Sequence, residues 1–163
     1  MRCAIIFRGT GKRMSKVEKK AYDTRVDAFF QKNTWADSAF CLAWVEKCFR
    51  KSLMQGWGRV PAEQSLLTLD NLHGQTTDKF KAYIKECNSL VRLYPGGCTD
   101  ALQPIDAGLG AFIKVEVGKQ LDLWLENGDN LERWESNALT ASDRRVLLTK
   151  WVARAVDLSL IHI

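Results

Sequence analysis

The chain has 163 residues, 46% of them hydrophobic and 26% charged, and its formal net charge is +5. This is enough for one folded domain with a buried core, and the composition argues against disorder. The positive charge favours an anionic partner, most simply a nucleic acid, although many basic proteins bind none. Five cysteines without a Cys-x-x-Cys pair argue against a disulfide framework or a zinc ribbon. The longest N-terminal hydrophobic run, CAIIF, is too short to span a membrane.

A hydrophobic stretch at residues 3–9 predicts a strand that is buried on both sides, and a strongly basic stretch follows it. Residues 8–20 contain a single acid, Glu18, and six cations: Arg8, Lys12, Arg13, Lys16, Lys19 and Lys20. Such a stretch is either a solvated loop or one that binds phosphate groups, and its residues alone favour neither. We take the six cations as candidate nucleic-acid-binding residues.

Hydrophobic residues at helical spacing predict a helix over residues 34–53, which Thr34 can cap. Residues 55–61 then interrupt the helical pattern. Within residues 64–74, the run Leu66 to Leu69 predicts a short buried strand with Asp70 at its carboxyl end. In open α/β sheets, functional residues gather at that end of the strands.

A second strand is predicted at residues 89–94, after a helix that Thr76 or Thr77 can cap. A strand, a crossover helix and a second strand form a unit in which the strands run parallel. The chain then turns at residues 95–97, and Asp106 stands where the next helix begins. We therefore expect Asp70 and the region of Asp106 to approach one another.

Two helices are predicted in the C-terminal third. One runs from Asp106 to a stop at Asn127-Gly128, and the other begins near Thr140 with Asp143 in a capping box. We place Arg145 on the outer face of this last helix, together with Arg144, Lys150 and Arg154. Residues 158–163, LSLIHI, do not continue the pattern well and are interpreted as a non-native scar, so His162 is left out of functional reasoning.

A carboxylate at the end of a strand, followed by another at the start of a helix, is the minimum for holding Mg²⁺ or Mn²⁺, which prefer oxygen ligands. Two such metals can cleave and rejoin phosphodiesters. Simpler roles compete with this one, because Asp70 can form a local turn and Asp106 can cap a helix. His73 is a weaker candidate, and the cysteines are interpreted as core residues. A small-molecule-binding α/β domain ranks low because the chain has no complete phosphate loop.

Three short motifs in a fixed order carry a resemblance to a known family. They are Leu69-Asp70-Asn71, then Pro95-x-Gly97-Cys98-Thr99, then Leu102-Gln103-Pro104-x-Asp106. This combination resembles the catalytic core of the Tigger/pogo/jerky group of DDE-superfamily transposases, whose relatives include centromere protein B. The resemblance covers nearly the whole chain.

The resemblance implies an RNase H-like α/β fold, a mixed sheet flanked by helices, that cleaves and transfers DNA strands with Mg²⁺ or Mn²⁺ in the nucleus. DNA is the implied partner and several copies of the chain can assemble, with no membrane or small-molecule cofactor involved. Asp70 matches the second acid of the catalytic triad, and Asp106 matches the third. The first acid would precede residues 3–9, and neither Asp23 nor Asp27 occupies the matching position.

We therefore expect an N-terminally truncated domain at residues 1–157 with little cleavage activity of its own. The alternative is a domesticated or decayed module that keeps the fold and binds DNA or another partner without catalysis.

Overall fold

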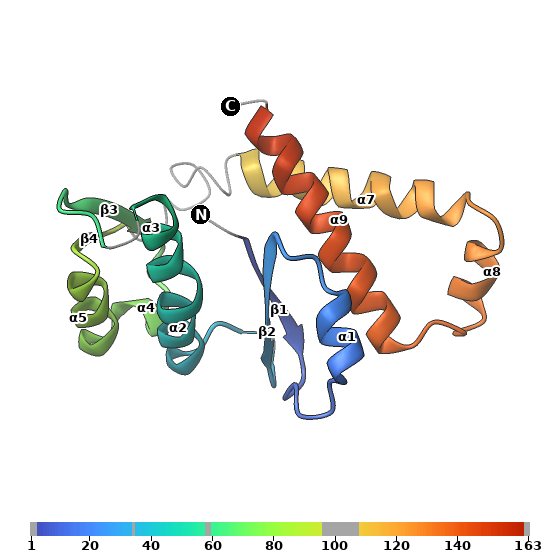
Figure 1. Cartoon of the computed structure of the whole chain (residues 1–163), viewed down its shortest axis with the longest axis horizontal. Helices are drawn as coiled ribbons and strands as arrows, with labels where there is room; N and C mark the ends of the chain where they lie inside the picture. The colour runs from blue at the N-terminus through green and yellow to red at the C-terminus, as the bar shows by residue number, and fades with distance from the viewer. Residues whose placement is uncertain (1–2, 34, 58–59, 96–107, 162–163) are drawn as a thin grey trace.

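The computed structural model describes residues 3–33, 35–57, 60–95 and 108–161, and within them the chain forms two groups of elements (Figure 1). The first group, here the β1–β2 lobe, contains two strands, one short helix and the C-terminal helices. These elements are β1 (Cys3–Arg8), α1 (Lys16–Ala21), β2 (Val26–Gln31), α7 (Gly110–Leu125), α8 (Asn130–Glu135) and α9 (Ala141–Ile161). The second group, the β3–β4 lobe, contains α2 (Ser38–Trp44), the π-helical turn η1 (Val45–Phe49), α3 (Arg50–Trp57), β3 (Ser65–Leu69), α4 (His73–Thr76), α5 (Asp78–Glu86) and β4 (Ser89–Leu93).

Each lobe contains one parallel pair of strands. β1 pairs with β2, and β3 pairs with β4 in a register that sets Leu66 beside Leu90. Parallel neighbours need a crossover connection, which α1 supplies in the first pair and α4 and α5 supply in the second. The predicted parallel unit at residues 64–94 is therefore confirmed.

The described strands form two separate pairs, whereas the sequence predicted one mixed sheet flanked by helices. The coarser prediction, a mixed α/β fold, is confirmed, and the RNase H-like sheet stays a prediction. β2 was not predicted: the segment VDAFFQ is short and follows a basic stretch that was interpreted as a loop. Asp27 accordingly lies within a strand, beside Ala4 of β1.

The β3–β4 lobe holds the main hydrophobic core. Asp37 caps α2 by accepting a hydrogen bond from the backbone N–H of Phe40 at 2.7 Å, so the helix starts later than predicted, while Thr34 lies outside the described residues. The π-helical turn follows α2 directly and buries Val45 completely. Across the core, α5 contributes Phe80 and Ile84, both fully buried. Other core members are Cys41, Phe49, Leu67, Leu69 and Cys87.

α5 begins as predicted, since the hydroxyl of Thr77 accepts a hydrogen bond from the backbone N–H of Phe80 at 3.3 Å. The capping box of α9 is also confirmed. The backbone N–H of Thr140 donates to Asp143 at 2.9 Å, and the backbone N–H of Asp143 donates back to the Thr140 hydroxyl at 3.2 Å. α7 ends at Leu125, before Gly128 with its positive φ of 61°, close to the predicted stop. α8 was not predicted.

The C-terminal helix α9 packs against the N-terminal elements β1, α1 and β2 (Figure 1). The hydroxyl of its Thr149, which is fully buried, accepts a hydrogen bond from the backbone N–H of Asp23 at 3.1 Å. Asp157 binds Arg25, which also pairs with Asp23 at 2.6 Å. On its other side α9 packs against α7, where Trp151 of α9 and Trp134 of α8 both meet Trp124 of α7 edge to face. The C-terminal helix is thus part of the structure that holds β1 and β2 in place.

α9 also runs to Ile161, beyond the boundary that the sequence placed after residue 157. Ser159 is buried, and its hydroxyl donates to the carbonyl of Val156 at 2.6 Å. The expectation that residues 158–163 leave the helical pattern is therefore wrong for the described part of the tail. The origin of these residues remains a prediction.

Four cysteines in the described segments, Cys3, Cys41, Cys48 and Cys87, are free, and the last three are buried as core residues. Within the same segments, no helix combines the length and the hydrophobicity that crossing a bilayer would require.

Candidate nucleic-acid and metal-binding sites

Asp70 lies directly after β3 and is half-buried. Its Oδ1 accepts a hydrogen bond from the backbone N–H of Leu72 at 2.6 Å, which forms a local Asx turn. Beside it, the side-chain amide of Asn71 donates to the carbonyl of Tyr94 at 2.8 Å, and the Tyr94 N–H donates to the carbonyl of Leu69 at 2.9 Å. The carboxyl ends of β3 and β4 are thereby fastened together, with a carboxylate fixed beside the junction.

The turn uses only one of the two carboxylate oxygens of Asp70. Oδ2 makes no hydrogen bond to the described residues, so an oxygen ligand of the kind that Mg²⁺ and Mn²⁺ prefer is left at this edge. Asp106 lies outside the described residues, as do all the motif residues from 97 to 106. Within the described segments, no group of three or more His, Cys, Asp or Glu residues could hold a metal. The pairing of Asp70 with Asp106 therefore remains a prediction.

His73 begins the short helix α4 and is exposed. Its carbonyl accepts a hydrogen bond from the Thr76 hydroxyl at 3.0 Å, which is a contact of the helix backbone. No catalytic or metal-binding role for this imidazole follows from its contacts.

The basic stretch forms a pocket of about 430 Å³ where β1 ends. The loop that follows β1 surrounds it, with Gly11 in a left-handed conformation at φ 68°. A Cβ on Gly11 would lie 3.1 Å from the ring of Phe30 in β2, so the close approach of the loop to this ring favours glycine. The lining residues are Arg8, Gly9, Thr10, Gly11, Lys12, Arg13, Met14, Phe30 and Arg145.

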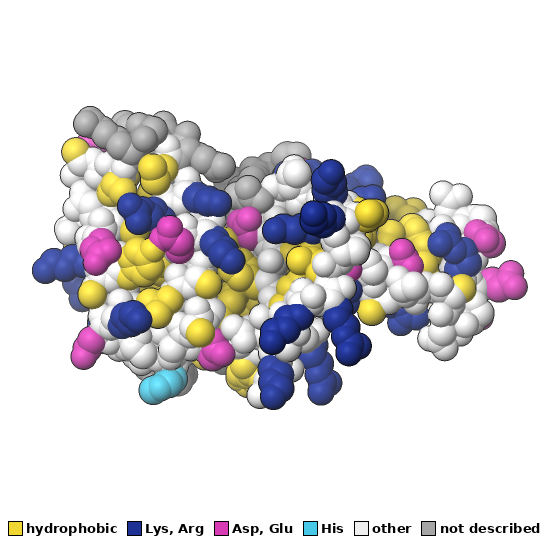
Figure 2. All heavy atoms as spheres, turned by 60° about the horizontal axis from the view of Figure 1, so that its bottom comes forward, with side chains coloured by type: hydrophobic (Ala, Val, Ile, Leu, Met, Phe, Trp, Pro, Cys, Tyr) yellow, Lys and Arg dark blue, Asp and Glu magenta, His cyan; other side chains and the backbone are white. Residues whose placement is uncertain are grey.

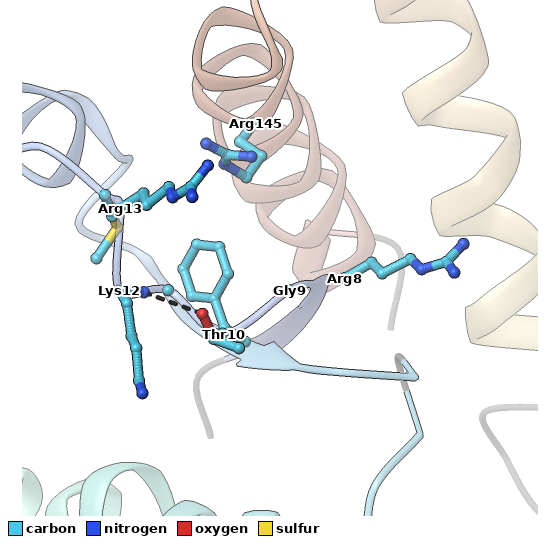
Figure 3. Close-up of a pocket in the computed structure, with 9 residues that line it drawn as sticks. Arg8, Gly9, Thr10, Lys12, Arg13 and Arg145 are labelled. Atoms are coloured by element: carbon cyan, nitrogen blue, oxygen red, sulfur yellow. Dashed lines mark hydrogen bonds between the residues drawn. The ribbon is translucent and has the colours of Figure 1, made fainter.

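The cations of this loop point in different directions (Figure 3). Arg13 extends toward Arg145, whereas Arg8 and Lys12 point away from that pair. The remaining candidates are exposed on α1 and do not line the pocket: Lys16, Lys19 and Lys20. Figure 2 shows Lys and Arg side chains gathered on one part of the surface in the lower middle of the view.

Arg145 was missed as a site residue because the sequence placed it on the outer face of α9. This placement is wrong, since its Nε donates to Oε1 of Glu18 at 2.7 Å and its guanidinium carbon lies 5.6 Å from the centre of the Phe30 ring. The two partners are 127 residues apart in the chain, so no local pattern reveals the pair. The one available signal was Glu18, a single acid within a run of cations.

Glu18 is the electrostatic partner of this pocket. Only 5% of it is exposed, and its Oε1 also accepts a hydrogen bond from the hydroxyl of Tyr22 at 2.5 Å. The hydrogen bond from Arg145 lowers the pKa of Glu18 to about 2. Burial, together with the hydrogen bond to Glu18, raises the pKa of Tyr22 to about 12. Glu18 is therefore ionised, and Tyr22 neutral, over the whole physiological range.

The fold and these sites define a mixed α/β domain with a carboxylate at a strand end and a separate cationic pocket. Residues 1–160 match the family model of the DDE superfamily endonucleases, so the chain belongs to this family.

Among curated proteins, the human "Pogo transposable element with KRAB domain" is 27% identical over 95 residues, which are 58% of this chain, and the mouse protein of the same name is 26% identical over the same length. The matched region spans 15% of each of these relatives. The similarity supports a transposase-derived domain of the pogo group. No solved structure matches the chain significantly.

Proposed function

We propose that this chain is part of a DDE-type nuclease domain of transposon origin that acts on DNA in the nucleus. The observation that carries the proposal is the fixed carboxylate of Asp70 at the junction of two parallel strands, in a chain that belongs to the DDE superfamily endonucleases. In this proposal the chain forms an RNase H-like domain of the Tigger/pogo/jerky group. Several copies of the complete protein assemble on DNA.

Asp70 and Asp106 are the proposed ligands of Mg²⁺ or Mn²⁺. Bound there, the metal would activate the attacking oxygen and stabilise the leaving oxygen of a phosphodiester. The contribution of the protein is positional: the Asx turn fixes Oδ1 of Asp70, and Asn71 ties that turn to the end of β4. A carboxylate held in this way needs little reorganisation when a cation arrives.

The basic stretch is the proposed contact to the DNA backbone. Arg8, Lys12 and Arg13 make no salt bridge within the described segments, so their charges are not neutralised by neighbouring carboxylates there. Exposed cations of this kind bind phosphates without reading the base sequence, and their contribution falls steeply as salt is added. Lys16, Lys19 and Lys20 extend the contact along α1.

The nuclease proposal is tested with D70N in the full-length protein. Asparagine keeps an oxygen that can accept the hydrogen bond from Leu72, so the turn survives while the charge is lost. D122N, an exposed position on α7, is the matched control. We expect D70N to reduce Mg²⁺-dependent nicking of supercoiled DNA by at least a hundredfold, since members of a catalytic set act as a unit. D122N should retain full activity.

Unchanged nicking by D70N would overturn the assignment. DNA binding with no metal-dependent nicking in the unmodified full-length protein would instead favour the alternative, a domesticated module without catalysis.

A further inference from the structure

Two guanidinium groups point toward each other at the pocket beside β1, and that of Arg145 lies 5.6 Å from the centre of the Phe30 ring. Arg13 comes from the loop after β1 and Arg145 comes from α9, and both line the cavity (Figure 3). Like charges in such an arrangement repel unless an anion lies between them. Within the described residues, Arg13 has no carboxylate partner, so the attraction that would offset this repulsion is absent on its side.

Arg145 is held in a defined orientation. Glu18 binds it through Nε, and Glu18 is itself fixed by Tyr22. Within the described residues, no hydrogen bond joins the two terminal nitrogens of the guanidinium to a carboxylate. These nitrogens form an edge that matches a phosphate group. Because the side chain is already ordered, less conformational entropy is lost when an anion binds.

The remaining walls of the pocket fit the same ligand. The Phe30 ring forms an apolar floor that Gly11 approaches closely, and the loop places backbone groups around the cavity. A volume of about 430 Å³ admits a phosphate group with part of its sugar, while the polar side chains that line it are cationic except for Thr10. A carboxylate ligand would also be attracted, but the surrounding excess of positive charge favours the more highly charged phosphate.

We propose that this pocket binds a single phosphate group of a nucleic-acid backbone between Arg13 and Arg145, with Glu18 as the residue that positions Arg145. The identity of the ligand as DNA rests on the proposed function, whereas the phosphate site itself rests on the geometry of the pocket. The proposed site binds one phosphate in a fixed position, whereas the exposed lysines on α1 contact phosphates without a fixed geometry.

The first test uses the full chain labelled with ¹⁵N and titrated with inorganic phosphate. We expect the Nε–H signal of Arg145 and the backbone amide signals of Gly11 and Arg13 to shift together and saturate. The same titration with sodium chloride at equal ionic strength is the control. Absence of a saturating shift at these three residues would overturn the proposal.

The second test measures binding of a fluorescent DNA duplex as a function of salt. R13A is the main variant, because Arg13 is exposed and its removal leaves no buried partner. R154A is the matched control, since Arg154 is also exposed and lies outside the pocket. We expect R13A to weaken binding about tenfold and R154A to weaken it less than twofold.

The double variant R13A/R145A separates one shared phosphate from two independent ones. If both arginines bind the same phosphate, the slope of log affinity against log salt falls by about 0.9 in total rather than by about twice that amount. Two results would overturn the proposed phosphate site without contradicting DNA binding. One is an equal loss of DNA affinity in R13A and R154A, and the other is a fall in the salt slope of the double variant by about twice 0.9. Saturating phosphate shifts without any DNA binding would support the pocket and contradict the proposed function.

Discussion

The buried pair of Glu18 and Arg145 should make the stability of the protein depend on pH in a way that one substitution removes. The pKa of Glu18 is lowered from 4.5 to about 2 in the folded chain. A depressed pKa contributes stability that is fully present above the unfolded value and is lost as the pH falls toward the folded value. The full depression corresponds to about 3 kcal/mol, of which about 1.4 kcal/mol is lost by about pH 3.5.

The effect is reduced by solvent, because 24% of the Arg145 side chain is exposed. Allowing for this screening, we expect about 1 kcal/mol of pH-dependent stability from Glu18 between about pH 6.5 and about pH 3.5. E18Q keeps an oxygen that can accept the hydrogen bonds from Arg145 and Tyr22 but cannot be titrated. The variant should therefore have a lower free energy of unfolding than the unmodified chain near pH 6.5. This difference in the free energy of unfolding should be smaller by about 1 kcal/mol near pH 3.5.

Urea unfolding followed by tryptophan fluorescence at both pH values measures this difference, and the chain contains six tryptophans as reporters. Asp23, whose pKa is lowered to about 2 chiefly by its hydrogen bond with Arg25, contributes with the same sign in both proteins and cancels. E46Q is the control, since the pair of Glu46 with Arg50 is half exposed and 3.7 Å long. A gap between E18Q and the unmodified chain that stays constant from pH 6.5 to pH 3.5 would refute this reasoning.

Three further substitutions test the β3–β4 lobe by the same unfolding assay. Phe80 is fully buried, so F80A should cost about 3–5 kcal/mol; a loss below about 1 kcal/mol would contradict its place in the core. A Cβ on Gly74 would lie 2.8 Å from the Cys41 sulfur and 3.0 Å from the Asp37 backbone, so G74A should destabilise by about 1–3 kcal/mol although alanine is the better helix former; a stabilised variant would show that the contact is not made. D70A should lose about 1 kcal/mol with the Asx turn while D70N loses little, and equal losses would show that the turn does not matter for stability.

The sequence predicted the parts of the fold that local patterns determine. The parallel strands around Leu66 and Leu90 follow from short hydrophobic runs that flank a helical stripe, and the caps at Thr77 and Thr140 follow from side chains that bind backbone N–H groups a few residues away. Each of these signals lies within one element or one connection, where spacing alone carries the information.

The parts that escaped prediction depend on residues far apart in the chain. β2 forms because residues Val26 to Gln31 pair with β1, since hydrophobic and polar residues do not alternate strongly in this segment. Arg145 was assigned to solvent because a charged residue on a helix is usually exposed, and only the approach of α1 supplies Glu18 as its partner. Asp106 lies outside the described residues, so its predicted role is untested and the proposed metal site rests on Asp70 and the family resemblance.

The packing of the C-terminal helix α9 against the N-terminal elements has a consequence for folding during synthesis. The described residues of the β3–β4 core, with the side chains packed against it, lie between Ala36 and Leu93, so this core can form while later residues are still being added. β1 and β2 emerge from the ribosome earlier, yet the contacts that hold them come from Arg145, Thr149 and Asp157. The β1–β2 pair therefore reaches its final structure only after α9 has been synthesised.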